Sequence, residues 1–177
     1  KSINLVIKLP YLRTSFQKSG KKVSKIIFET LPNTIILAVT SISIAVVFGI
    51  LFGIIASIYK NTWMDLFLQL FSTLGMSLPS FFSAILFSWF FGFLYGEITG
   101  LNMTGSIYEI DDFGEGKVLI IKNLILPAIV LGIRPIAVII QLMRNSLLEV
   151  LSQDYIKTAY SKGLSKYEVI LKHGIKN

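Results

Sequence analysis

Residues that could support catalysis or bind a metal ion are few in this sequence. His173 is the only histidine, the chain has no cysteine, and no carboxylate pattern typical of a metal or nucleophilic site lies near His173. The segment GEGK at 114–117 differs from a phosphate-binding loop, because Asp111 stands where its first glycine belongs and Val118 where its serine or threonine belongs. We therefore expect no enzymatic activity and no bound metal, and we expect any ATP to be bound by another chain.

Acidic side chains gather between residues 97 and 117, and carboxylate oxygens are ligands that calcium prefers. These side chains are Glu97, Glu109, Asp111, Asp112 and Glu115. The spacing in EIDDFGEG does not match the loop of an EF-hand, so the sequence favours a solvated acidic loop over a calcium site.

Arg134 lies near the middle of an apolar run, NLILPAIVLGIRPIAVIIQLMR, directly before Pro135. A charge at that depth of a membrane helix costs roughly 2.5–3.5 kcal/mol, so the side chain should face protein or water. Two roles stay open. The guanidinium could bond the Leu131 carbonyl that Pro135 leaves without its donor, or it could line a transport path.

Hydroxyl groups surround Pro79 in the run LGMSLPSFFSAILF. Pro79 removes the donor for the Gly75 carbonyl, and glycine relieves the crowding there, so we expect a kinked but continuous helix. The nearby serines could line a polar path or bond back to their own helix carbonyls. They are Ser72, Ser77, Ser80 and Ser83, of which Ser80 and Ser83 are the candidate path residues.

The elements that must position these residues are apolar helices. The chain is 53% hydrophobic and only 15% charged, which is too apolar for an ordinary soluble domain. Residues 30–59 and 66–96 contain no charged side chain, and residues 118–143 contain only Lys122 and Arg134. Each run exceeds the roughly 20 apolar residues that one crossing needs, and none alternates like a barrel strand. We predict transmembrane helices at 31–59, 66–96 and 118–144.

Small residues recur at every fourth position of the first run, along one helical face. They are Ser41, Ala45, Gly49, Gly53 and Ser57. Such a face lets another helix approach closely, because packing takes the place of the hydrophobic effect inside lipid. The pattern predicts helix packing within a bundle.

Charge does not fix the orientation of these helices. Seven Lys or Arg residues precede Glu29 and six follow Met143, and three crossings put these two groups on opposite sides. The net charge of +7 could indicate nucleic acid binding. The basic residues flank apolar runs instead of forming one patch, so we expect a lipid bilayer and no nucleic acid as partner.

The C-terminal stretch QDYIKTAYSKGLSKYEVILKHGIKN is polar and helix-like. A short helix is expected over residues 154–162, where Tyr155, Ile156, Ala159 and Tyr160 share helical spacing. Gly163 then permits a turn, and a capping box of Ser165 with Glu168 begins a second helix. An amphipathic hairpin lying on lipid has the same composition and stays an alternative.

This stretch resembles the cytoplasmic coupling loop of ABC importer permeases of the dipeptide, oligopeptide and nickel type, in which a T/A-A-x-x-x-G core precedes a second short helix. Further matches are LPNTIILAV, SLPSFF and LILPAIVLG, in the family's order, and SFQKSGKKVSKII suits the segment before them. The resemblance covers roughly residues 13–177. It implies that the ATPase-coupling residues are Asp154, Tyr155, Thr158, Ala159, Gly163 and Leu164.

The resemblance also implies an all-α membrane fold with six crossings, of which this chain would hold the second to fourth and end in a helix-turn-helix coupling loop. Residues 1–30 would be a basic amphipathic segment outside the cell, 97–117 an extracytoplasmic loop, and 145–177 the cytoplasmic coupling loop. The chain begins without Met and its last residue falls in an apparent helix, so we expect a fragment. Lys157 and Lys176 stand where the general importer pattern has Glu and Pro.

The expected partners are a second permease subunit, cytoplasmic ATPase subunits that bind ATP and magnesium, and an extracytoplasmic solute-binding protein. The expected location is the inner membrane of a prokaryote, and the expected solute is a peptide or a similar small molecule. The alternative is a membrane assembly or anchoring subunit that does not transport.

Overall fold

The computed structural model describes residues 12–18, 20–110 and 117–175, and the chain forms two compact units, Lys1–Ile36 and Leu37–Asn177. In the first unit, a turn closes where Thr14 and Lys22 form an isolated antiparallel bridge. The predicted basic segment over residues 1–30 lies partly outside the described residues. Its last part is helical, because helix α1 begins at Val23.

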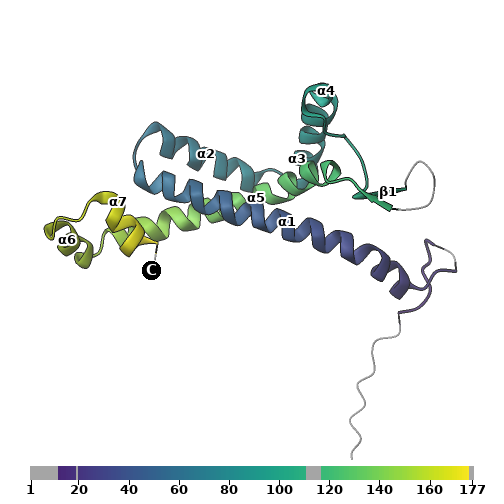
Figure 1. Ribbon diagram of the computed structural model, residues 1–177, viewed down its shortest axis with the longest axis horizontal. Helices are drawn as coiled ribbons and strands as arrows, with labels where there is room; N and C mark the ends of the chain where they lie inside the picture. The colour runs from purple at the N-terminus through teal and green to yellow at the C-terminus, as the bar shows by residue number, and fades with distance from the viewer. Residues whose placement is uncertain (1–11, 19, 111–116, 176–177) are drawn as a thin grey trace, which may run out of the picture. The chain divides into compact units, whose positions relative to one another are not determined.

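Helix α1 (Val23–Ile58) has 36 residues and contains Pro32 without ending there. It stops three residues before Asn61, whose positive φ of 62° reverses the chain. Asparagine tolerates this left-handed conformation better than most residues. Helix α2 (Trp63–Ser77) therefore starts directly after the turn and runs back along the bundle (Figure 1).

The prediction of a continuous helix over residues 66–96 is wrong. Helix α2 ends at Ser77, α3 (Ser80–Phe87) begins after Pro79, and the two helical stretches are bent by 110°. Leu78 is extended, with ψ of 133°, because a residue before proline is disfavoured in the helical region. The chain therefore breaks at Leu78 and Pro79 instead of bending around Gly75.

Helix α3 continues into a π-helical segment, η1 (Ser88–Leu94), and then into the short helix α4 (Gly96–Thr99). Strand β1 (Tyr108–Ile110) then pairs antiparallel with β2 (Lys117–Leu119). The predicted acidic loop therefore has regular structure at both ends. Its acids Asp111, Asp112 and Glu115 lie outside the described residues.

Helix α5 (Lys122–Leu151) has 30 residues and contains two prolines. The third crossing was predicted to begin at residue 118, but residues 117–119 belong to strand β2, and the helix runs seven residues past the predicted end at 144. Residues 145–151, which were expected in the coupling loop, therefore belong to α5.

The chain after α5 folds as helix α6 (Asp154–Ser161), helix α7 (Lys166–Val169) and a π-helical segment, η2 (Ile170–Gly174). Figure 1 shows α6 and α7 at one end of α5 and strand β1 near the other. The two ends of α5 therefore meet different neighbours.

Two helices of the described chain, α1 and α5, are long and apolar enough to cross a membrane unbroken. Helix α2 together with residues 80–94 would add a third crossing if the bent pair counts as one span. Unlike α1 and α5, this bent pair is either one broken span or a re-entrant loop.

The small-residue face of α1 packs on α5. All five residues of the predicted stripe are buried, namely Ser41, Ala45, Gly49, Gly53 and Ser57. A Cβ atom built on Gly49 would lie 2.7 Å from Ile139 Cβ, and one on Gly53 would lie 2.6 Å from Met143 Cβ. The Ser57 hydroxyl donates to the Arg144 carbonyl at 3.2 Å. Only small side chains allow these backbones to come so close.

Candidate functional site

The helix break at Pro79 forms one wall of a cavity of about 300 Å³. The opposite wall is the middle of α5. The cavity is lined by Gly75, Leu78, Ser80, Ser83, Val130, Leu131, Ile133, Arg134 and Pro135. The structure therefore brings together the three residues that the sequence marked as candidate path residues, namely Ser80, Ser83 and Arg134.

A second cavity, of about 540 Å³, lies on the other side of Ser80. It is bounded by α3, α5 and the loop before β1, and it shares Ser80, Val130 and Leu131 with the first. Asn123 holds the loop in place, because its carboxamide accepts from Asn102 Nδ2 at 2.9 Å and donates to the Ser106 carbonyl at 2.8 Å. The two cavities are therefore neighbours that share Ser80, Val130 and Leu131 in their walls.

Arg134 is exposed, and within the described chain its guanidinium makes no hydrogen bond and no ion pair. The expected bond to the Leu131 carbonyl is therefore not formed. The exposed side chain of Arg134 lines the cavity of about 300 Å³.

The serines around the break divide into two groups. Ser72 donates to the Leu68 carbonyl and Ser77 to the Thr73 carbonyl, each at 2.8 Å, so both are satisfied by their own helix. Ser83 lies 3.5 Å from the Pro79 carbonyl oxygen, at the limit of a hydrogen bond. Only the serines after Pro79 line the smaller cavity.

An ion pair between Asp65 and Arg144 joins the start of α2 to α5, and sequence reasoning missed it. Arg144 Nε lies 2.7 Å from Asp65 Oδ1 and Nη2 lies 2.8 Å from Oδ2, which is a bidentate geometry. The Asp65 side chain is 2% exposed and that of Arg144 14% exposed. The Asn61 amide and Gln69 Nε2 also donate to Asp65, each at 3.0 Å. The sequence did contain a signal for a buried ion pair, since Asp65 is the only acid between residues 60 and 96.

Helices α6 and α7 form a hairpin with its own apolar core. Ile156, Ala159 and Val169 are buried together, and Leu164 packs against them. Gly163 makes the turn with φ of +84°. This is a left-handed conformation that glycine adopts without strain.

The predicted capping box at the start of α7 is confirmed. The Ser165 amide and hydroxyl both donate to Glu168 Oε2, at 2.9 and 2.8 Å, and the Glu168 amide donates to Ser165 Oγ at 3.4 Å. These donors stabilise the carboxylate, and the Ser165 amide is the main reason that the pKa of Glu168 lies below its usual value. The box fixes where α7 begins.

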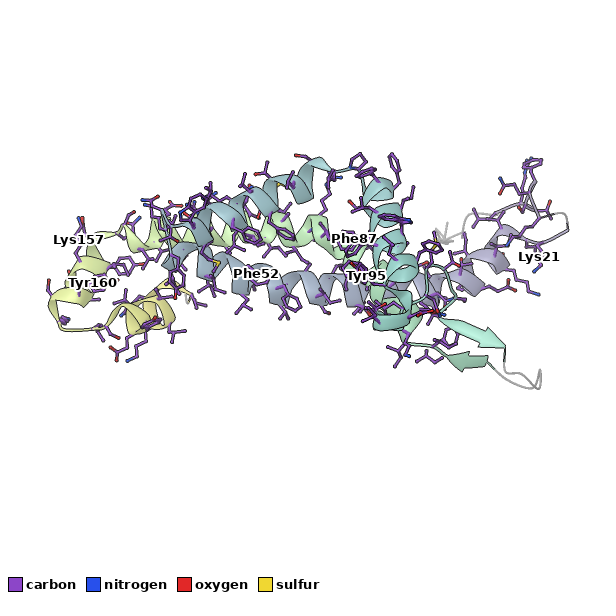
Figure 2. All side chains as sticks on the ribbon, turned by 90° about the horizontal axis from the view of Figure 1, so that it is seen from above. Lys21, Phe52, Phe87, Tyr95, Lys157 and Tyr160 are labelled. Carbon is purple, nitrogen blue, oxygen red and sulfur yellow. The ribbon has the colours of Figure 1, made fainter. Side chains whose placement is uncertain are left out.

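The candidate coupling residues lie on different sides of the hairpin. Asp154, Tyr155 and Thr158 are exposed, whereas Leu164 is partly buried. Ala159, another of these candidates, is only 6% exposed and belongs to the hairpin core. Figure 2 shows Lys157 and Tyr160 of α6 at the end of α5 that lies away from Phe87 and Tyr95.

The hairpin is packed tightly against the end of α5. Leu147 is 1% exposed, and a Cβ atom built on Gly174 would lie 2.5 Å from Leu147 Cδ1. Val150 and Leu151, in the last turn of α5, contact the hairpin core. The hairpin and this end of α5 therefore form one packed body.

In the part of the chain that the structure describes, no three His, Cys, Asp or Glu side chains gather at one place. The prediction of a solvated loop instead of a calcium site at EIDDFGEG depends mainly on residues 111–116, which lie outside the described residues.

Comparison with known proteins identifies the family. Residues 49–177 match the family described as binding-protein-dependent transport system inner membrane component. The dipeptide transport system permease protein DppB of Escherichia coli K12 is 53% identical over 57 residues, which make up 32% of this chain and 17% of that protein. The corresponding DppB of Haemophilus influenzae Rd is 51% identical over a stretch of the same length.

A longer match is found with the oligopeptide transport system permease protein AppB of Bacillus subtilis 168. It is 31% identical over 172 residues, which cover 93% of this chain and 50% of AppB. The chain thus spans about half the length of AppB. Because the family match covers well over half of the chain, the protein is a multi-pass membrane protein that belongs to the family of binding-protein-dependent transport system inner membrane components.

Proposed function

We propose that this chain is part of the membrane subunit of an ATP-driven importer of peptides, and that it forms part of the solute path and transmits movement from ATPase subunits. The observation that carries the proposal is the hairpin of α6 and α7 packed on the end of α5, within the region that matches the family. The names of the relatives indicate a peptide as the solute.

The solute path is proposed to run along the two neighbouring cavities that share Ser80, Val130 and Leu131 in their walls. Both are bounded by α3 and α5, and both lie beside a break in the second crossing. A broken helix can change its angle at the break without unfolding either half, which is what alternating access to a path requires.

Coupling is proposed to start on the exposed face of α6, around Tyr155 and Thr158. An ATPase subunit that binds ATP and magnesium would hold this face in a groove and move it as the ATPase closes. Because the hairpin core packs against Val150 and Leu151 and Gly174 of η2 packs on Leu147, movement of the hairpin would reach α5 directly. In this arrangement Gly163 faces the cytoplasm and the loop around Gly105 faces outside, where a binding protein delivers the solute.

The chain would act with a second permease subunit in the inner membrane of a prokaryote. It would bind no cofactor itself, since ATP and magnesium would belong to the ATPase. Lys157 stands where the general importer pattern has a glutamate, and it pairs with Asp154 at 2.8 Å on the surface of α6. The contact with the ATPase is therefore proposed to depend on Tyr155 and Thr158 and not on an acid at position 157.

Gly163 offers a direct test, because no atom lies within 4 Å of a Cβ built there, so only its backbone angle restricts substitution. Gly163→Val in the full-length permease should strain the turn by about 1–2 kcal/mol or more. We expect at least a several-fold loss of ATPase co-purification and of peptide-stimulated ATP hydrolysis in liposomes. Gly163→Asn is the matched control, since asparagine tolerates positive φ, and it should keep both.

Two outcomes would contradict the proposal. If Gly163→Val retains wild-type association and hydrolysis, the hairpin does not couple. If the wild-type permease binds no ATPase subunit at all, the chain is a membrane anchoring or assembly subunit instead.

A further inference from the structure

We propose that Arg134 and Ser80 bind the C-terminal carboxylate of the transported peptide. This inference rests on the proposed function, because it assigns a ligand group to the same path. It follows from the lack of a partner for Arg134 among the described residues, from the sizes of the two cavities, and from the chemistry of their lining.

The first argument is the state of Arg134. Arg134 lies in the middle of a helix that is apolar enough to cross the membrane, where an unpaired charge is unfavourable. No carboxylate among the described residues pairs with it, whereas the Asp65 carboxylate is fully engaged by Arg144 and two further donors. Within the part of the chain that the structure describes, the guanidinium therefore keeps its donors available for an anion.

The second argument is the arrangement of hydrogen-bond donors. The Ser80 hydroxyl, like the guanidinium, makes no hydrogen bond within the described chain, and both side chains line the cavity of about 300 Å³. Most of the remaining lining is apolar, including Leu78, Val130 and Ile133. A planar guanidinium pairs with a carboxylate through two parallel hydrogen bonds, and an apolar surrounding strengthens that attraction.

The third argument is size. The smaller cavity is at the lower end of the range of ligand pockets, and the cavity of about 540 Å³ shares Ser80, Val130 and Leu131 with it. One end of a short peptide fits the smaller cavity while the rest occupies the larger. Every peptide with a free C-terminus carries a carboxylate, so one cation at this place serves peptides of many sequences.

The experiment compares two probes, an alanine tripeptide and its C-terminal amide, in uptake by liposomes. The liposomes contain the full-length permease assembled with its ATPase subunits and binding protein. We expect Arg134→Gln to lower the ratio of acid to amide uptake by about tenfold, the effect of losing one hydrogen bond to a charged group. The binding protein is the same for wild type and variant, so its own preference cancels from the comparison. Arg134→Lys should retain part of the preference for the acid over the amide.

Ser80→Ala supplies a second variant in case Arg134→Gln does not fold, and we expect it to lower the ratio by a few fold, as befits a single neutral hydrogen bond. Ser77→Ala is the matched control, because the Ser77 hydroxyl is bonded to the Thr73 carbonyl and lies outside both cavities. It should leave the ratio unchanged.

The outcomes separate the inference from the function on which it rests. An unchanged ratio with normal uptake by Arg134→Gln overturns carboxylate binding and leaves the importer intact. Equal loss of acid and amide uptake also overturns it, and indicates that Arg134 pairs with a protein segment outside this chain. If the wild type takes up neither probe in an ATP-dependent way, the proposed function fails first.

Discussion

Helix α5 carries two arginines ten residues apart that the fold treats in opposite ways. Arg144 is held by both oxygens of Asp65 and is largely buried, whereas Arg134 is exposed and unpaired within the described chain. Near Arg144, α1 and the hairpin pack closely on α5. Near Arg134, the break at Pro79 leaves a cavity instead. The region of α5 around Arg144 is closed by packed neighbours, and the region around Arg134 is open to a cavity.

The difference shows two ways in which a membrane helix can accommodate a cation. A pair formed within the chain fixes helices relative to one another, because both partners lose stability if they separate. A cation at a cavity fixes nothing within the described chain and stays free to bind a ligand. We infer that the closed region of α5 transmits movement and the open region meets the solute.

The largest effect that tests this comparison should come from Asp65→Asn. The substitution leaves the largely buried Arg144 without a carboxylate, and breaking a buried pair in this way costs about 3–5 kcal/mol. We expect the free energy of unfolding of the full-length permease in detergent to fall by that amount, measured by denaturant titration.

Asp154→Asn is the matched control, since it breaks the Asp154–Lys157 pair, whose side chains are 94% and 75% exposed. It should change stability by no more than about 1 kcal/mol. Equal effects of the two substitutions would show that the Asp65–Arg144 pair does not hold the closed region.

A smaller effect should follow from Gly53→Ala, which tests the contact of α1 with the closed region. The added Cβ would lie 2.6 Å from Met143 Cβ and 3.0 Å from the Ile140 carbonyl oxygen, so the helices must separate. We expect a loss of about 1–3 kcal/mol in the same titration, despite the gain in helix propensity that alanine brings.

The control is Gly96→Ala in α4, where the nearest atom to the new Cβ is the Leu101 carbonyl oxygen at 3.7 Å. This is an ordinary contact, and we expect no loss of stability. If Gly53→Ala stabilises the permease as well, α1 and α5 are not packed as closely as described.

The smallest effect concerns pH and the capping box of the hairpin. Ser165 lowers the pKa of Glu168 below its ordinary value of 4.5, so the folded hairpin binds this proton less readily than the unfolded chain does. The stabilisation is complete at neutral pH and is lost as the pH falls through the pKa of the folded state.

A pH titration of the Ser165 amide signal by NMR should therefore give a midpoint below 4.5. In Glu168→Gln the titration step should disappear, because that side chain carries no proton in this range. A midpoint at or above 4.5 would mean that the box is open in solution.

Features that depend on local pattern could be predicted from the sequence. The capping box needs only two residues three positions apart, and Gly163 needs only its own backbone angle. The small-residue face of α1 likewise follows from one period of one helix, and all five of its members are buried.

Features that depend on contacts between distant segments could not be predicted. Asp65 and Arg144 are 79 residues apart, and nothing local tells either residue which partner it meets. Proline can kink a helix or end it, and at Pro79 the extended Leu78 decided the outcome. Helical spacing placed Ala159 on a face of α6, but only the position of α7 shows that this face is covered.

The length of α5 has a mechanical consequence. Its 30 residues make a rod of about 45 Å, so an upright α5 would project about 15 Å beyond a hydrocarbon core of about 30 Å. A rod of that length that swings by about 10° about one end moves its other end by about 8 Å. Gly174 packs on Leu147, and the core of the hairpin packs against Val150 and Leu151, so under the proposed function a small rotation of the hairpin would be transmitted along α5 towards the cavity beside Pro79.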